Sequence, residues 1–208
     1  MKPQLSKLFA AGALLVAGFA AGGTALAQPL PGQPAPTFKL EDVNGRTVSL
    51  ADLRGRYVVL EWNNPNCPFV RKHYASGNMQ SLQARYGADK VAWLLVNSTA
   101  PGTEDYMDGK KLAAWLAEQK SQPTALLLDP SGEVGRAYAA KVTPQMVVID
   151  PRGTVIYNGA IDDKRSANAA DVAGARNYVA AALDEARAGK PVSVASTTPY
   201  GCTVKYKP

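Results

Sequence analysis

Residues 57–70 read Tyr-Val-Val-Leu-Glu-Trp-Asn-Asn-Pro-Asn-Cys-Pro-Phe-Val, and this stretch decides the fold. An apolar run ends in a polar bend, and Cys67 follows where a helical pattern begins. Pro68 suits the first helical position, because the N–H that proline lacks would have no partner there. The sequence therefore predicts a thiol at the start of a helix after a buried strand, where the helix dipole favours the reactive thiolate. A buried, inert packing cysteine is the alternative.

The first 27 residues have the pattern of a secretory signal peptide. Lys2 and Lys7 form a positive segment, residues 8–21 are apolar and uncharged, and residues 25–27 fit a cleavage site. The apolar part is short for a membrane anchor, so we expect cleavage after Ala27. The sequence predicts a periplasmic or secreted protein with no membrane contact after cleavage. An uncleaved N-terminal anchor is the alternative.

Composition excludes several classes of function. The two lysines of the signal segment account for the difference between the net charge of +6 for the whole chain and +4 for the mature chain. We find no basic stripe interleaved with aromatic residues, so we expect no nucleic-acid partner. A single histidine and two cysteines provide no cluster with zinc-ligand spacing, and we expect no metal and no other cofactor.

The rest of the chain alternates between strand and helix patterns, without repeats or an internal linker. Strands are expected at residues 37–40, 46–50, 57–62, 91–96, 124–128, 146–150 and 154–157. Helices are expected at residues 68–86 with a break at Ser76-Gly77, at 108–120, in a short stretch up to 140, and at 169–188. Parallel βαβ units followed by an antiparallel pair predict an α/β fold with a mixed sheet and helices on both faces. An extended arm (28–36) precedes the expected domain (37–188), and a polar tail (189–208) follows it.

Residues 142–144 (Val-Thr-Pro) open the expected strand near residues 145–150. Together with Cys67 at a helix start, this arrangement resembles the thioredoxin fold. The resemblance implies a cis Thr143–Pro144 bond beside the reactive cysteine and a substrate groove at Thr143, Pro144 and Pro68. Because a proline removes one N–H, the backbone beside it stays free to pair with an extended peptide.

The thioredoxin motif is incomplete in this chain. Thioredoxins carry a second cysteine three residues after the first, and Val70 stands there instead. This departure excludes an intrahelical dithiol cycle, so release of a mixed disulfide needs another thiol. Glu61 lies six residues before Cys67, where thioredoxins have a buried acid that transfers protons. A hydrogen-bonded structural glutamate at a strand end is the alternative.

Peroxiredoxins offer a competing motif, Pro-x-x-x-Thr-x-x-Cys. Asn64 stands at its threonine and Leu60 at its proline, so the hydroxyl that would hold a peroxide is missing. The overall layout is nevertheless similar to the redoxins of the AhpC/TSA type. Residues 67–74 and 199–206 are similar to segments of the peroxiredoxin-like thioredoxin-family proteins, and the resemblance covers nearly the whole mature chain.

Cys202 is the best candidate for the missing thiol. It lies in a glycine-containing polar tail that could reach back over the domain. Three interpretations stay open: Cys202 resolves an oxidised Cys67, forms a permanent bridge with it, or stays unpaired. A bridge would close a long loop and stabilise the fold by up to about 5 kcal/mol in the chain-entropy model.

Other polar residues have simpler interpretations. His73 lies six residues after Cys67, on the opposite helical face, and is interpreted as solvated. Asp162 and Asp163 are interpreted as a turn with helix-capping character. Arg71 and Lys72 could stabilise a Cys67 thiolate or face solvent.

The sequence thus predicts an exported thiol-dependent oxidoreductase. Cys67 would attack a disulfide or a peroxide, Cys202 would resolve the product, and Glu61 would assist proton transfer. The expected partners are protein or small-molecule disulfides, with peroxide as a further candidate, and an external thiol reductant. Two alternatives remain: a thiol peroxidase, and a non-catalytic thioredoxin-like module with a structural Cys67–Cys202 disulfide.

Overall fold

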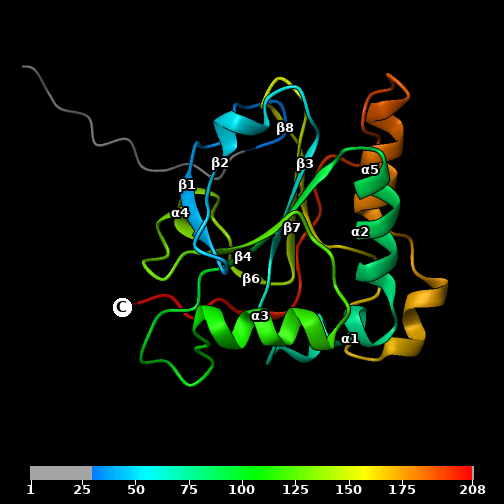
Figure 1. The fold of residues 1–208 in the computed structure, drawn as a ribbon. Helices are drawn as coiled ribbons and strands as arrows, with labels where there is room; N and C mark the ends of the chain where they lie inside the picture. The colour runs from blue at the N-terminus through cyan, green and yellow to red at the C-terminus, as the bar shows by residue number, and fades with distance from the viewer. Residues whose placement is uncertain (1–29, 208) are drawn as a thin grey trace, which may run out of the picture.

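A computed structural model describes residues 30–207, which form a seven-stranded mixed sheet in the order β2-β1-β5-β4-β3-β7-β8 (Figure 1). Its strands are β1 (Lys39–Asp42), β2 (Thr47–Ser49), β3 (Val58–Trp62), β4 (Ala92–Asn97), β5 (Ala125–Leu128), β7 (Gln145–Ile149) and β8 (Val155–Gly159). Strands β3, β4 and β5 are parallel, and β7 joins β3 antiparallel. The predicted α/β class with a mixed sheet is confirmed.

The predicted signal peptide lies outside the described residues. Within residues 30–207, no helix is both long and apolar enough to cross a membrane.

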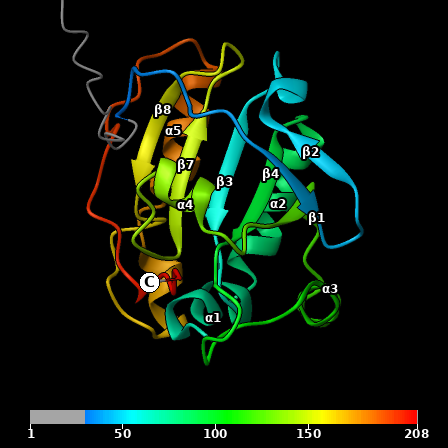
Figure 2. The same cartoon turned by 90° about the vertical axis from the view of Figure 1, so that its left-hand side faces the viewer.

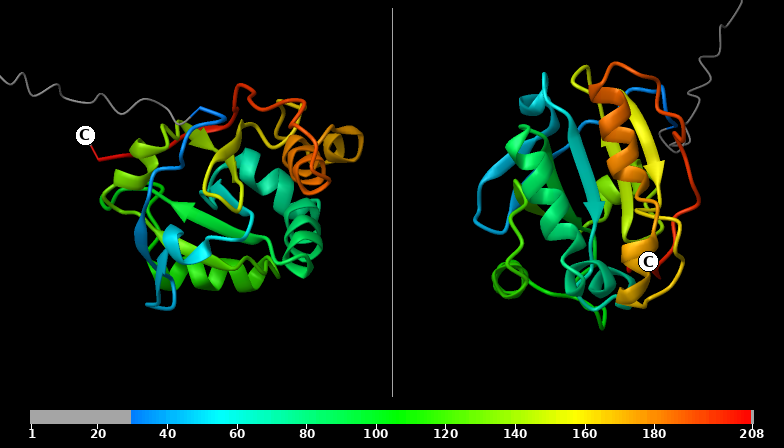
Figure 3. Two further views of the ribbon diagram at one scale, coloured as in Figure 1. Left: turned by 90° about the horizontal axis from the view of Figure 1, so that it is seen from above. Right: turned by 90° about the vertical axis from the view of Figure 1, so that its right-hand side faces the viewer.

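Helices cover both faces of the sheet (Figures 1 and 3). The helices are α1 (Pro68–Ala75), α2 (Asn78–Ala88), α3 (Gly109–Glu118), α4 (Glu133–Ala137) and α5 (Tyr178–Arg187), with 3-10 turns η1 (Leu50–Leu53) and η2 (Ala169–Gly174). Residues of α1, α2, α3 and α5 share one core cluster, whereas α4 and η1 contribute to the other. Because side chains alternate along β3, Val59 belongs to the first cluster, and Val58 and Leu60 belong to the second.

The helix break predicted at Ser76-Gly77 is confirmed, since α1 ends at Ala75 and Gly77 adopts a φ of 73°. The single helix expected at 169–188 is wrong. It is divided into η2 and α5, because Ala175 is extended and Asn177 starts a new helix by accepting a hydrogen bond from the N–H of Ala180 (2.8 Å). The apolar periodicity continues across this gap and therefore did not reveal it.

The two ends of the described chain run along the β8 side of the molecule (Figure 2). Near the N-terminus, the N–H of Gly32 donates to the carbonyl of Val155 (2.8 Å). The C-terminal tail passes β8, where the N–H of Asn158 donates to the carbonyl of Ala195 (3.1 Å). The tail then forms β9 (Cys202–Thr203), which pairs antiparallel with β6 (Val142–Thr143) in a separate two-stranded sheet. The tail is thereby attached along its length to the domain.

Candidate functional site

Cys67 occupies the N-cap position of α1, directly after the bend that follows β3. Its N–H donates to the carbonyl of Asn64 (3.0 Å), and its own carbonyl accepts from the N–H groups of Val70 and Arg71 (3.0 Å each). The thiol is almost fully buried, with 2% of the residue exposed. Its Sγ donates to the carbonyl of Thr143 at 3.0 Å. The helix start and the segment before β7 therefore meet at this sulfur.

The Thr143–Pro144 peptide bond is cis, as the resemblance implied. Thr143 is also the residue opposite Cys202 in the β6–β9 pair. Thr143 thus contacts both cysteines, since its carbonyl accepts a hydrogen bond from Cys67 and its backbone lies opposite Cys202 in the strand pair. The structure brings together the four residues predicted from the thioredoxin resemblance and the tail: Cys67, Thr143, Pro144 and Cys202.

The two thiols are free and interact with each other. Burial, followed by the hydrogen bond with Cys67 and the charge of that thiol, raises the pKa of the Cys202 thiol to about 12. Two thiols this close do not both ionise at neutral pH, because the first negative charge opposes the second. The pair can therefore hold one thiolate and one proton donor.

Gly201 allows this close approach. Its φ is +148°, and a Cβ at this position would overlap the carbonyl oxygen of Thr143 and lie 3.2 Å from the nitrogen of Pro144. Any larger side chain would push the tail away from β6. The glycine therefore permits Cys202 to lie beside Cys67.

Glu61 is fully buried on β3, on the face covered by α1 and α2. Its carboxylate accepts hydrogen bonds from Asn63 Nδ2 (3.0 Å), Tyr74 OH (2.8 Å) and Trp93 Nε1 (2.9 Å). Burial raises the pKa of Glu61, and these three donors only partly oppose that shift. Asn63 lies in the bend before Cys67, so the acid is linked to the site through this neighbour.

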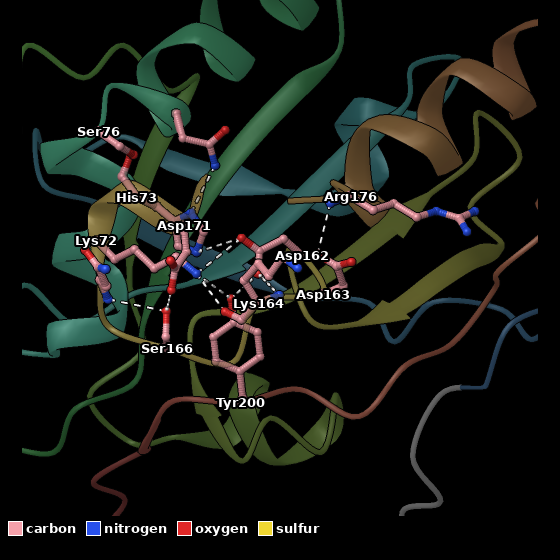
Figure 4. A network of polar contacts seen from close by, with 12 residues as sticks. Lys72, His73, Ser76, Asp162, Asp163, Lys164, Ser166, Asp171, Arg176 and Tyr200 are labelled. Atoms are coloured by element: carbon pink, nitrogen blue, oxygen red, sulfur yellow. Dashed lines mark hydrogen bonds and ion pairs between the residues drawn. The ribbon is translucent and has the colours of Figure 1, made fainter. Parts of the chain in front are cut away.

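A buried polar network corrects the sequence interpretations of Lys72, His73 and, in part, Asp162 (Figure 4). Lys72 is not on a solvated face: its Nζ lies 3.4 Å from Asp162 Oδ2 and donates to the carbonyl of Lys164 (2.7 Å) and to Tyr200 OH (3.3 Å). Asp162 does form a turn contact, since its Oδ1 accepts from the N–H of Lys164 (3.0 Å), but it is also 2% exposed and accepts a hydrogen bond from Tyr200 OH. Asp163 accepts from the N–H of Arg176 (3.0 Å), which precedes α5, and it caps neither η2 nor α5, whose N-caps are Asn168 and Asn177.

His73 is fully buried, which contradicts its interpretation as a solvated residue. Its Nδ1 accepts from the amide of Asn78 (3.0 Å), so the proton of the neutral ring is on Nε2, which points toward Asp162 Oδ2 at 3.9 Å. Counting residues along one helix could not show this, because the covering groups come from segments distant in the sequence. Burial lowers the pKa of His73 to about 4, although the charge of Asp162 opposes the shift.

A titration of His73 tests this environment. The neutral ring is favoured in the folded state, so protonation favours unfolding, and stability falls as the pH drops from 6.5 towards 4. The expected loss from this residue is about 3 kcal/mol. His73 is the only histidine of the chain, so its ring proton NMR signals can be followed without assignment by mutation. A titration midpoint near 6.5 would contradict the buried position.

Arg71 lies on the exposed side of the site and is held against the bend. Its Nε donates to the carbonyl of Pro65 (3.0 Å), and Nη2 lies 3.4 Å from Asn66 Oδ1. A pocket of about 390 Å³ opens here. Its lining residues are Pro65, Asn66, Arg71, Tyr74, Ala75, Met107, Trp115 and Gln119. This pocket has one guanidinium and several apolar groups, and it includes Pro65 and Asn66 of the bend before Cys67.

Sequence reasoning missed the role of Tyr200 and the strand that carries Cys202. Residues 200–206 (Tyr-Gly-Cys-Thr-Val-Lys-Tyr) alternate apolar and polar residues, but only a polar tail was expected there. This alternation is the signal that could have found the strand, because its apolar positions are Tyr200, Cys202, Val204 and Tyr206.

Comparison with known proteins agrees with this geometry. The family model described as "AhpC/TSA family" matches residues 31–158. Thiol-disulfide oxidoreductase ResA of Bacillus subtilis is 27% identical over 127 residues, which cover 56% of this chain and 71% of that protein.

Two solved structures extend the comparison to most of the chain. The crystal structure of an uncharacterized conserved protein from Geobacillus kaustophilus has a TM-score of 0.74 and 27% identity, and covers 87% of this chain and 94% of its own. The crystal structure of a putative thiol:disulfide interchange protein DsbE from Chlorobium tepidum has a TM-score of 0.52 and 27% identity. The match covers 62% of this chain and 83% of that protein's chain. The matched family model spans more than half of the chain, and the resemblance seen in the cysteine and cis-proline segments is confirmed. The chain belongs to the AhpC/TSA family, and its fold is thioredoxin-like.

Proposed function

We propose that this protein is an exported thiol-disulfide oxidoreductase that uses Cys67 as nucleophile and Cys202 as resolving thiol. The observation that carries the proposal is the placement of both thiols at the same residue, since Cys67 Sγ bonds the Thr143 carbonyl and Cys202 is the strand partner of Thr143. The names of relatives such as ResA support a disulfide substrate. The N-terminal pattern of residues 1–27 supports export.

The proposed reaction has two exchange steps. The Cys67 thiolate attacks one sulfur of a substrate disulfide, forms a mixed disulfide and releases the first substrate thiolate. The Cys202 thiolate then attacks Cys67 Sγ, forms the Cys67–Cys202 bridge and releases the second substrate thiolate. Two electrons pass to the substrate, which takes up two protons, and an external thiol reductant returns the bridge to two thiols.

The coupled pair supplies a reason for the order of these steps. When Cys67 loses the proton that it donates to the Thr143 carbonyl, its charge and its hydrogen bond help to keep Cys202 protonated. Once Cys67 is part of a mixed disulfide, its negative charge is gone and the pKa of Cys202 falls. Cys202 therefore becomes a better nucleophile after the first step, when its attack is needed.

Access to Cys67 requires the tail to move. Cys67 is 2% exposed, and β9 lies beside it on a strand pair of two residues each. In the proposed cycle β9 moves aside to admit substrate and returns for resolution. In this cycle the domain spanning residues 37–188 provides the nucleophile Cys67, and the tail at 189–208 provides the second thiol.

The same site gives less support to peroxide chemistry. Asn64 stands where peroxiredoxins place a threonine, and its Oδ1 accepts a hydrogen bond from the N–H of Asn66 (2.8 Å). This side chain therefore helps to shape the bend before Cys67, and it has no hydroxyl with which to hold a peroxide.

The Cys202→Ser variant tests the proposal. We expect it to accumulate a mixed disulfide between Cys67 and glutathione, because the resolving attack is lost, whereas the wild type releases glutathione and closes its bridge. Mass spectrometry of samples equilibrated in glutathione buffers distinguishes the two products. A wild-type bridge that stays closed below about −300 mV would support a structural disulfide and contradict the proposal.

A further inference from the structure

The tail is held by a buried polar cluster that the proposed chemistry does not use (Figure 4). Tyr200 is 6% exposed, and its hydroxyl donates to Asp162 Oδ1 and accepts from Lys72 Nζ at 3.3 Å. The same Nζ lies 3.4 Å from Asp162 Oδ2 and 5.5 Å from the centre of the Tyr200 ring. The tail thus contributes one hydroxyl and one ring to an ion pair of the domain.

Burying this cluster of polar groups is energetically unfavourable compared with filling the same space with apolar side chains. Lys72 and Asp162 are 2% exposed each, and burying a lysine–carboxylate pair costs several kcal/mol in desolvation before any attraction is gained. Apolar side chains of similar size often stabilise a core equally well. The pair also provides direction, because the Tyr200 hydroxyl contacts both Lys72 Nζ and Asp162 Oδ1 and is therefore held at one place between them.

The position of the anchor determines where Cys202 lies. The Tyr200 ring packs edge-on against Phe69 at 5.8 Å between centroids, in the first turn of the helix that Cys67 caps. Gly201 then passes against the Thr143 carbonyl, and Cys202 follows as the strand partner of Thr143. Beyond the thiol, the N–H of Val204 donates to the carbonyl of Lys141 (3.0 Å). The anchor lies two residues from the sulfur, so a shift there moves the thiol directly.

We propose that Tyr200 is a positioning residue, held by the Lys72–Asp162 pair, which sets the effective concentration of the Cys202 thiol at Cys67. This inference rests on the proposed function. Holding two reacting groups in place raises the effective concentration of an intramolecular reaction by orders of magnitude. Loss of the anchor is expected to lower the effective concentration of the Cys202 thiol at Cys67.

The Tyr200→Phe variant tests the anchor. It retains the ring that packs on Phe69 and removes only the hydroxyl. We expect the effective concentration of the Cys67–Cys202 pair, measured by equilibration with reduced and oxidised glutathione, to fall by at least about tenfold. The rate at which a mixed disulfide with glutathione closes to the bridge is expected to fall by a similar factor.

Tyr138→Phe is the matched control. Tyr138 is buried in the other core cluster, and its hydroxyl donates to the carbonyl of Pro36 (2.6 Å), so the variant loses one comparable hydrogen bond away from the thiols. We expect it to keep the wild-type effective concentration. Unfolding midpoints measured in a Cys202→Ser background separate a general loss of stability from a loss of positioning.

Gly201→Ala provides a second, independent variant. Its methyl group would overlap the Thr143 carbonyl oxygen, so it displaces β9 directly and does not remove the Tyr200 hydroxyl. We expect it to lower the effective concentration at least as much as Tyr200→Phe.

Two results would overturn the inference in different ways. If the wild type forms no Cys67–Cys202 bridge, both the proposed function and the positioning role of Tyr200 are wrong. If the wild type forms the bridge but the effective concentration in Tyr200→Phe is within twofold of that in the Tyr138→Phe control, only the positioning role of Tyr200 is wrong.

Discussion

The Cys67→Ser variant is expected to reduce disulfides at least about a hundredfold more slowly than the wild type, because a serine hydroxyl is a poor nucleophile toward sulfur at neutral pH. The substitution is small, and the hydroxyl can still donate to the Thr143 carbonyl that now accepts from Sγ. Loss of activity would then come from the chemistry and not from the fold. Reduction of insulin in the presence of dithiothreitol, followed by turbidity, measures the rate.

Cys202→Ser is the matched control for this experiment. Both variants lose one thiol from the same pair, but Cys202→Ser keeps the nucleophile. We expect one equivalent of substrate thiol to be released rapidly, followed by slow turnover that depends on the external reductant. If Cys67→Ser and Cys202→Ser lost the same fraction of activity from the first turnover, Cys67 would not be the nucleophile. Consumption of hydrogen peroxide by the wild type without reduction of insulin would favour the peroxidase alternative.

Local features of this chain could be predicted from the sequence, since they depend on neighbours along the chain. The apolar run, the bend and Pro68 together place Cys67 at a helix start, and the structure agrees. The cis bond at Thr143–Pro144 came from the thioredoxin resemblance, and it too is present. Ser76-Gly77 ends α1 because a glycine readily adopts a positive φ, here 73°.

Contacts between distant segments could not be predicted in the same way. Lys72 and His73 follow Cys67 on a helix whose exposed face could only be guessed from spacing. The groups that cover them, Asp162 and Tyr200, lie about a hundred residues further along the chain. The sequence contains no local sign that a polar helix face will be buried, so spacing alone predicts a solvated His73 and a Lys72 that is either solvated or a partner of the thiolate.

The same limit applies to the tail. Residues 200–206 alternate apolar and polar residues, but such a pattern does not reveal which strand they pair with. In the structure β9 pairs with β6, because Gly201 lets the chain approach Thr143. The expectation that Cys202 reaches back over the domain depended on the number of cysteines and the export pattern. The structure adds the route and the partner strand.

Glu61→Ala is expected to lower the free energy of unfolding by at least about 3 kcal/mol, because it leaves buried donors without an acceptor and opens a cavity. Trp93 Nε1 loses its acceptor at 2.9 Å, and Tyr74 OH and Asn63 Nδ2 lose the oxygen that they share. Urea denaturation at neutral pH measures the change. A variant as stable as the wild type would show that this network contributes nothing to the fold.

Glu61→Gln is the control, and it also separates the two interpretations of this acid. An amide oxygen can accept from Trp93, and its NH₂ group can donate to Tyr74 OH and to Asn63 Oδ1, a buried atom that has no hydrogen-bond partner in the structure. We therefore expect a stability within about 1 kcal/mol of the wild type. If Glu61 is only structural, the variant keeps its rate of disulfide reduction. If Glu61 transfers protons, that rate falls by about a hundredfold or more.

The pH dependence of stability, compared between the wild type and Glu61→Gln, tests the environment of Glu61 a second time. Burial raises the pKa of Glu61 above its ordinary value of 4.5, so the folded state holds this proton more tightly than the unfolded state. The folded state is therefore penalised once the carboxyl must ionise, and the contribution of Glu61 to wild-type stability falls as the pH rises from about 4.5 through the raised pKa. The contribution of His73 has the opposite sign, and the comparison with Glu61→Gln cancels it because both proteins contain this histidine. Glu61→Gln has no such proton, so its stability relative to the wild type should improve across this range. A difference that does not change with pH would mean that Glu61 ionises in the folded protein as readily as in the unfolded chain, and the three donors would then fully offset its burial.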